Sequence, residues 1–314
     1  MSRTDDESRK ANDMRVSNAQ TSAAMHANMN RKSEDMAKVQ AQIASGLRLE
    51  RPSDDPIASA RLLRIQREQA SLAQYNENID RVKGDLSIQE VHLSSSADVL
   101  SSMRDLLLWA SNESNSGEDL AAIANQLSSL EQTAANCFNV KDEAGNYLFS
   151  GTKIDVPAVR FDDATGRYVM NGNSKVRKTM VGNGILIDKN VTAKAILGDN
   201  AEVLNKLHEL VVSLKDAPRA TATKQQLKDT LDLLEVAHGN VLEAITDLGG
   251  RQNMLELMKD SNEDVNLVHE KTKDDLKNLD MGQAVLQLRG YEVSMQASQK
   301  VYSRLANISL FELI

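Results

Sequence analysis

The chain has 314 residues, a formal net charge of −8 and only 3% aromatic residues, which argues against an enzyme with a broad, aromatic-lined pocket. The acidic balance and the lack of a Lys/Arg cluster argue against a nucleic-acid partner. The single cysteine, Cys137, excludes an intrachain disulfide.

The first stretch, residues 1–13, is polar and charged and has none of the apolar core of a secretory signal peptide. We expect it to be a disordered lead or an upstream start, with the structural part beginning at Met14. A helix is predicted to follow, because methionine and aliphatic residues recur at helical spacing. No apolar run in the chain approaches the ~18 residues of a membrane helix, so we expect no membrane insertion. The stripe on the predicted helix consists of Met25, Met29, Met36, Val39 and Ile43.

Two aspartates and a proline, Asp54, Asp55 and Pro56, mark the start of the next helix. A carboxylate at the N-cap accepts hydrogen bonds from the first amides, and proline suits the first turn. Adjacent carboxylates also suggest a metal site, but neighbouring aspartates do not converge on one point at a helix start. We therefore interpret Asp54 or Asp55 as a helix cap.

The clearest periodic pattern runs from Ile65 to Leu107. Steps of three and four residues give thirteen positions, of which ten are apolar. This heptad seam predicts a helix of roughly 65 Å at 1.5 Å per residue. Trp109 follows the seam, and we expect it to anchor packing. The three polar exceptions in the seam are Glu68, Gln89 and Ser96.

A polar turn at residues 112–117 is predicted to lead into a second helix over residues 118–136. The texture then changes, because seven of the fifteen glycines lie between Gly145 and Gly198. We expect a small β-rich insertion here, with a hairpin loop at residues 162–166 and a tight turn at residues 183–184. The strand-like runs are residues 147–149, 159–161, 168–170, 176–181 and 185–187.

Helix is predicted again over residues 201–215, followed by a second seam from Leu227 to Leu255. Gly249 and Gly250 interrupt it, so the helix either tolerates them for close packing or kinks there. A third seam follows near the C-terminus. It consists of Met281, Ala284, Leu288, Tyr291, Met295, Ser298, Tyr302 and Leu305.

This order predicts a mainly α fold, a long antiparallel helical bundle formed by both chain ends with a small β-rich insertion in the middle. We expect residues 14–45 and 281–314 to form a terminal coiled-coil domain. Residues 46–146 and 199–280 are expected to form the long-helix bundle, and residues 147–198 the insertion.

The two terminal stripes are too narrow to form a good core within one chain. We interpret them as surfaces that neighbouring copies complete, and a coiled-coil homodimer is the competing form. Methionine suits such surfaces because it adapts to imperfect packing. The expected interface residues are Met25, Met29, Met36, Val39, Ile43, Leu288, Tyr291, Met295, Tyr302, Leu305, Ile308 and Phe311.

Residues typical of catalysis or metal binding do not form a pattern. No two of the five histidines have the i, i+4 spacing of a metal site. Nucleophile-elbow, Walker A and dinucleotide-binding motifs are missing. We expect no catalytic residues, no metal and no cofactor.

Two N-terminal motifs resemble a known family. Residues 40–48 read QAQIASGLR and residues 52–56 read PSDDP, and together they resemble the N-terminal signature of bacterial flagellins and flagellar hook-associated proteins. Residues 14–17, MRVS, resemble the usual start of the family, and residues 1–13 precede it. Residues 146–152, NYLFSGT, resemble the segment that closes the N-terminal helical half.

The C-terminal half carries two more motifs of this family. Residues 248–256, LGGRQNMLE, resemble the signature of the long C-terminal helix, which favours a continuous helix through the glycines. Residues 306–314, ANISLFELI, resemble the family's C-terminal end. The PSDDP form, the SLFEL ending and the single small insertion favour the hook–filament junction members over the filament flagellins.

The resemblance implies a structural subunit of the bacterial flagellum rather than an enzyme. It implies secretion through the flagellar type III apparatus without a cleaved signal peptide, with an export chaperone on the C-terminal end. The implied partners are further copies in a ring, hook-associated protein 1 and flagellin. The insertion would face outward. A filament-forming flagellin and a cytoplasmic coiled-coil adaptor are the alternatives.

Overall fold

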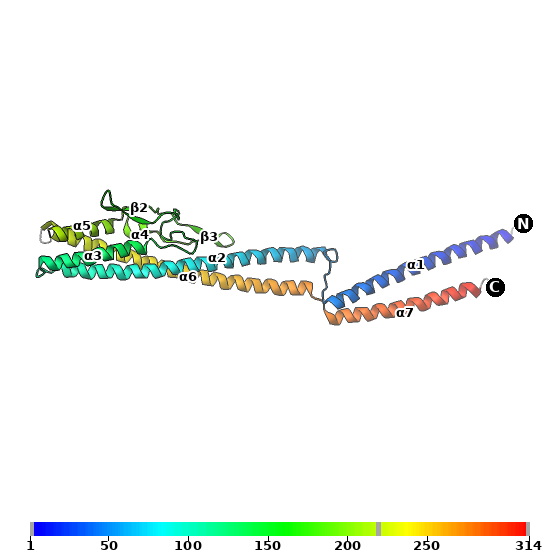
Figure 1. Ribbon diagram of the computed structural model, residues 1–314. Helices are drawn as coiled ribbons and strands as arrows, with labels where there is room; N and C mark the ends of the chain where they lie inside the picture. The colour runs from blue at the N-terminus through cyan, green and yellow to red at the C-terminus, as the bar shows by residue number, and fades with distance from the viewer. Residues whose placement is uncertain (1–2, 218–220, 312–314) are drawn as a thin grey trace. The chain divides into compact units, whose positions relative to one another are not determined.

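The computed structural model describes residues 3–217 and 221–311, and it is mainly α-helical with two small antiparallel sheets. This confirms the predicted fold class. Figure 1 shows the helices and strands, coloured by their position along the chain. The helices are α1 Arg3–Ser45, α2 Pro56–Ala110, α3 Gly117–Cys137, α4 Ala193–Leu197, α5 Glu202–Asp216, α6 Thr221–Lys277 and α7 Met281–Phe311.

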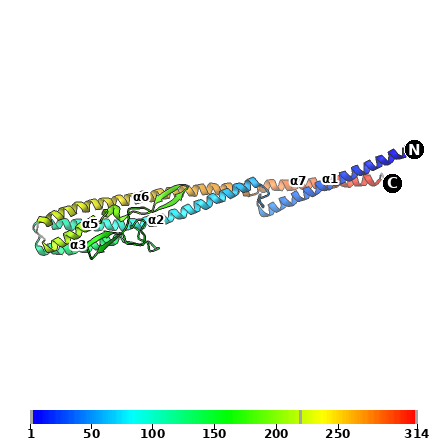
Figure 2. The same cartoon turned by 90° about the horizontal axis from the view of Figure 1, so that it is seen from above.

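Two compact units divide the chain. The terminal unit contains residues 1–69 and 267–314, and the central unit contains residues 70–266. α2 and α6 contribute to both units. Figures 1 and 2 both show α1 beside α7, with the two chain ends at the same end of this helix pair.

α1 begins at Arg3 and is therefore longer than expected. Residues 3–13, predicted to be a disordered lead, are helical, and residues 1–2 lie outside the described part of the chain. The physical reason is that no glycine or proline precedes Gly46, so nothing interrupts the backbone hydrogen bonds. The missing apolar periodicity had hidden this extension, because periodicity reports burial rather than helix formation.

The core of the central unit lies between α2, α3, α5 and α6. The predicted seam of α2 forms part of this core, since the side chains of Ile79, Leu86, Leu93 and Leu107 are fully buried. Side-chain bonds join α2 to α6 in opposite chain order, from Arg104–Glu235 at 3.3 Å to Lys259–Asp80 at 2.7 Å. This order confirms the antiparallel arrangement. α6 continues through Gly249 and Gly250 as one helix, which agrees with the continuous helix that the resemblance favours.

The insertion contains two hairpins. β1 Val159–Asp162 pairs with β2 Arg167–Met170, and β3 Lys178–Gly182 pairs with β4 Ile185–Asp188. Both predicted turns are confirmed, and Gly184 has the positive φ of 74° that a tight turn requires.

The expected strand at residues 147–149 is wrong. Tyr147 makes only an isolated bridge to Lys141, while Leu148 and Phe149 are buried in a loop. The ring of Phe149 packs edge-on against Phe138, with centroids 5.7 Å apart. The apolar run at residues 147–149 therefore indicates burial but not a strand, since a short apolar run alone does not define the secondary structure. The short helix α4 was not predicted.

Candidate assembly surface

α1 and α7 pair along their predicted stripes within one copy. Val39 on α1 and Ala284 on α7 are buried, at 6% and 3% exposure. Two polar contacts add to the pairing. His26 Nε2 lies 3.1 Å from the Tyr302 hydroxyl oxygen. Lys32 Nζ lies 5.0 Å from the centroid of the Tyr291 ring, a cation–π geometry.

Most of the expected interface residues stay half-buried in this pair. Each helix is covered from one side only, so the stripes meet without forming a sealed core. The arrangement leaves part of their apolar area exposed. The half-buried residues are Met25, Met29, Met36, Ile43, Leu288, Tyr291, Met295 and Tyr302. The side chains of Leu305, Ile308 and Phe311 lie outside the described part of the structure.

The opposite face of α7 carries a second apolar stripe that the sequence analysis missed. Leu286, Val293 and Val301 are 70%, 66% and 47% exposed. Leu286 lies two residues from both Ala284 and Leu288, which puts it on the far side of the helix from α1. The signal was present in the spacing, since these residues fall about two turns apart. Gly290 on the same face has no heavy atom within 4 Å of the place where a Cβ would be.

Asp55 rather than Asp54 has the geometry of the helix cap. Asp55 Oδ1 accepts a hydrogen bond from the Ala58 amide at 3.0 Å, and this bond lowers the pKa of the Asp55 carboxyl. Asp54 Oδ2 accepts from the Arg51 amide at 2.9 Å instead, which lowers the pKa of Asp54 and closes the preceding turn. Pro56 is the first residue of α2. The two neighbouring aspartates thus serve two consecutive backbone turns.

The two segments that lead out of the terminal helices are tied to each other. The Arg48 amide donates to the Lys277 carbonyl at 2.8 Å, and the Leu279 amide donates to the Gly46 carbonyl at 3.0 Å. Arg48 Nη2 also donates to the Leu276 carbonyl at 2.7 Å. This small backbone pairing fixes where the α1–α7 pair begins.

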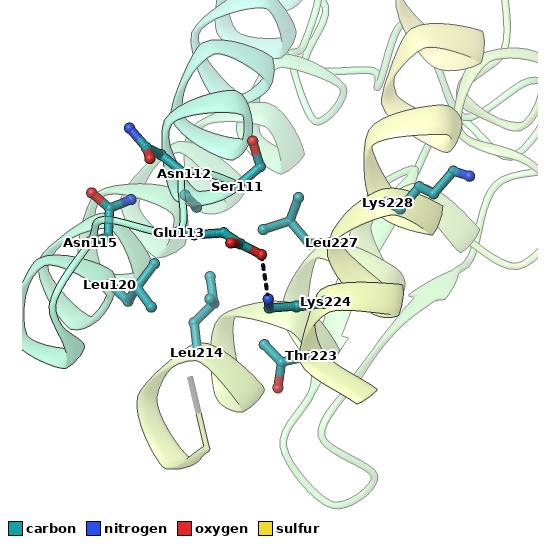
Figure 3. Close-up of a pocket in the computed structure, with 11 residues that line it drawn as sticks. Ser111, Asn112, Glu113, Asn115, Leu120, Leu214, Thr223, Lys224, Leu227 and Lys228 are labelled. Atoms are coloured by element: carbon teal, nitrogen blue, oxygen red, sulfur yellow. Dashed lines mark hydrogen bonds and ion pairs between the residues drawn. The ribbon is translucent and has the colours of Figure 1, made fainter. Parts of the chain in front are cut away.

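A pocket of about 520 Å³ lies where the central helices end (Figure 3). Leu120, Leu214 and Leu227 form its apolar wall. Its Glu113 and Lys224 pair with each other at 2.8 Å, which lowers the pKa of Glu113. This pairing suits a crevice between helix ends better than a reaction site.

Within residues 3–217 and 221–311, no three His, Cys, Asp or Glu side chains gather in a way that could hold a metal ion. Over the same residues, the helices lack an apolar stretch of membrane-spanning length.

Comparisons with known proteins place the chain in a family. Residues 16–154 match the family model described as the bacterial flagellin N-terminal helical region. Flagellar hook-associated protein 3 of Escherichia coli K12 is 26% identical over 296 residues, covering 87% of this chain and 90% of that protein.

Two solved structures have the same fold. A protein of Vibrio parahaemolyticus, described as a flagellar hook-associated protein, is 38% identical with a TM-score of 0.66, covering 72% of this chain and all of that one. The flagellar junction protein FlgL of Legionella pneumophila shares the fold at 17% identity, with a TM-score of 0.57 and coverage of 69% and 100%. The chain therefore belongs to the bacterial flagellin and flagellar hook-associated protein family, and within it resembles hook-associated protein 3.

Proposed function

We propose that the protein is the ring subunit that joins hook-associated protein 1 to the flagellin filament. The proposal has the chain exported without a cleaved signal peptide, held by an export chaperone beforehand, and assembled with further copies outside the cell. Its relatives are flagellar components, and one of them is described as a junction protein.

The carrying observation is the incomplete coverage of α7. One face meets α1, and the opposite face exposes Leu286, Val293 and Val301. An apolar stripe of this kind on an isolated helix pair marks an interaction surface. In this proposal residues 14–45 and 281–314 form the assembly domain, residues 46–146 and 199–280 the rod, and residues 147–198 the outward insertion.

Complementation of cells that lack the gene tests the proposal. Without the gene we expect hooks without filaments and flagellin lost to the medium. Full-length protein should restore filaments, whereas a chain lacking residues 285–314 should fold its central unit and fail to be incorporated. Restoration of filaments by the truncated chain contradicts the proposal.

A pair of point variants separates the exposed stripe from export. Leu286→Asp with Val293→Asp should abolish incorporation while the protein still reaches the medium, because it charges the exposed face. Gln296→Asp, at an exposed position on the same helix, is the matched control and should assemble. Long filaments from the purified protein alone would instead indicate a flagellin.

A further inference from the structure

One of the two Asn-Gly dipeptides of the chain lies at the tip of the β3–β4 hairpin. Asn183 and Gly184 form the turn between Gly182 and Ile185, which are partners in the strand register. Both turn residues are exposed, and Gly184 has a φ of 74°. Among the described residues, no heavy atom lies within 4 Å of the place where a Gly184 Cβ would be. The turn is therefore open to water, and its glycine tolerates a wide range of backbone angles.

The second Asn-Gly dipeptide, Asn171-Gly172, lies in a packed loop. Gly172 is buried, and its amide donates to the Ala158 carbonyl at 3.2 Å. The Asn171 amide donates to the same carbonyl at 3.0 Å. A Cβ on Gly172 would lie 3.1 Å from Ser150 Cα. The backbone of this second dipeptide is thus held in place by hydrogen bonds and packing, whereas that of the first is not.

An Asn-Gly dipeptide permits a reaction between the side chain and the backbone. The asparagine side chain is short enough to meet its neighbouring backbone amide. When the nitrogen of the next residue attacks the side-chain amide carbon, a five-membered ring closes. A Cβ on that next residue would crowd the nitrogen, and glycine has none. The ring closes only where the backbone can rotate, so a packed and hydrogen-bonded segment must first open locally.

We propose that Asn183, and not Asn171, deamidates spontaneously in the folded protein. The Gly184 nitrogen forms a bond to Asn183 Cγ, and the Cγ–Nδ2 bond breaks. The proton of the Gly184 amide leaves with the Asn183 amino group as ammonia. Water then opens the cyclic imide at either of its two carbonyl carbons: its hydroxyl stays on that carbon and its proton returns to the nitrogen. One opening gives aspartate, and the other gives isoaspartate, whose backbone runs through the former side chain.

The two products change the hairpin in different ways. Aspartate adds a negative charge beside Ile185 and Leu186, which are 42% and 55% exposed. Isoaspartate adds the same charge and also lengthens the backbone by one methylene, which disturbs the pairing of Gly182 with Ile185. The contact of the hairpin with α2 lies further from the turn, where Asn78 Nδ2 donates to the Met180 carbonyl at 2.8 Å. The isoaspartyl form should therefore loosen the tip of the hairpin and keep this contact.

Peptide mapping of the full-length protein tests the proposal. The protein is incubated at pH 8 and digested with trypsin, which cuts after Lys and Arg. Asn183 then lies in the peptide of residues 179–189, and Asn171 in that of residues 168–175. We expect the first peptide to be converted to two products of equal mass, aspartyl and isoaspartyl, while the second stays unchanged. Conversion should be faster at higher pH, because the attacking nitrogen must lose its proton.

Protein unfolded in guanidinium chloride is the control, because unfolding exposes both dipeptides. Both peptides should be converted there at similar rates, and a lack of conversion overturns the proposal. Asn183 that reacts in the unfolded chain but stays intact in the folded protein also overturns it, because the turn then protects the side chain. Equal conversion of Asn171 and Asn183 in the folded protein overturns the selection of one site by the fold.

Amide exchange measures the consequence for the hairpin. After the reaction, the amides of residues 182–187 should exchange faster than in fresh protein. Fresh Asn183→Asp is the matched control, because it adds the charge without the extra methylene, and it should exchange like the unreacted protein. Asn183→Gln cannot close the five-membered ring, so it should keep its protection through the same incubation. Unchanged exchange in the isoaspartyl form overturns the loosening. The reaction needs only water and the turn, so these results are independent of the proposed assembly role.

Discussion

Glu131 Oε1 on α3 lies 3.0 Å from His208 Nδ1 on α5, beneath the β1–β2 hairpin. The Phe161 ring of β1 packs on His208 with centroids 5.0 Å apart, and Tyr168 of β2 packs on Phe161 at the same distance. Glu131 is 3% exposed, and its burial raises the pKa of the carboxyl. Burial and the neighbouring Glu131 carboxylate together raise the pKa of Tyr168.

This buried carboxyl predicts a pH-dependent effect of Glu131→Gln. A pKa raised by folding favours the protonated form, so its stabilising contribution is present at low pH and is lost as pH rises through the folded-state pKa. Replacing the carboxylate by a neutral amide should therefore raise the free energy of unfolding at pH 8, by about 1 kcal/mol. The gain should vanish near pH 4, where the wild-type carboxyl is protonated.

Urea titrations of both proteins between pH 4 and pH 8 measure this difference. A variant that is less stable than the wild type at pH 8 and equal to it at pH 4 would show that the contact with His208 outweighs the burial of the charge. Carboxyl groups whose pKa is lowered, such as those of Asp54, Asp55 and Glu256, make both proteins less stable as the pH falls. This effect is common to the two proteins, so only the difference between their curves reports on Glu131.

Substitution of Gln89 should destabilise the part of the insertion that it holds by hydrogen bonds. Gln89 is fully buried in the α2 seam, where its Oε1 accepts from the Val191 amide at 2.9 Å and its Nε2 donates to the Lys189 carbonyl at 3.0 Å. Gln89→Leu should cost about 1–3 kcal/mol, because it leaves buried backbone groups unpaired. Amide exchange at Val191 should quicken.

The matched control is Gln132→Leu, at an exposed position of α3, where a surface substitution should change the free energy of unfolding by less than about 0.5 kcal/mol. Equal effects of the two substitutions would mean that the bonds of Gln89 do not hold the insertion.

Gly249 and Gly250 predict a gain in stability on substitution. Neither has a heavy atom within 4 Å of the place where a Cβ would be, so neither permits close packing within the copy. Gly249→Ala and Gly250→Ala should each raise the free energy of unfolding by about 1 kcal/mol, the helix-propensity difference. Thermal unfolding followed by circular dichroism measures the change.

Gly172→Ala is the contrasting control, because a Cβ there would lie 3.1 Å from Ser150 Cα. It should destabilise the protein. If the two helix variants are more stable yet fail to assemble, the space beside Gly249 and Gly250 is used by a neighbouring copy. If they are less stable, a packing role within the copy has been missed.

The sequence predicted the features that depend on local residue patterns. The α2 seam, the antiparallel arrangement and both hairpin turns follow from spacing and turn residues, which act locally. The Gln89 exception in the seam was visible in the sequence, but its role was not, since its partners Lys189 and Val191 lie about a hundred positions away. Trp109 was expected to anchor packing, but it is 56% exposed. Its position after the seam does not show which side of the helix faces the core.

The candidate surface was predicted in part. The stripes by which α1 and α7 pair were predicted because methionine recurs in them at helical spacing, for example at Met29 and at Met295. The exposed face of α7 was missed because Leu286 and Val293 are separated by polar residues and by Gly290. α7 has two apolar stripes, and the position of α1 decides which of them is covered. The residue spacing within α7 alone does not show this.

Each long pairing in this protein joins an early segment to a late one. α1 lies against α7, α2 is bonded to α6, and Gly46 and Arg48 meet Lys277 and Leu279. Contacts between such distant positions form late, because a large loop must close first. Until the C-terminal residues are present, α1 therefore has no α7 to pair with, and the terminal unit cannot form. If the chain is exported as proposed above, this order of pairing would leave the terminal segments unfolded until the whole chain has passed through the export channel.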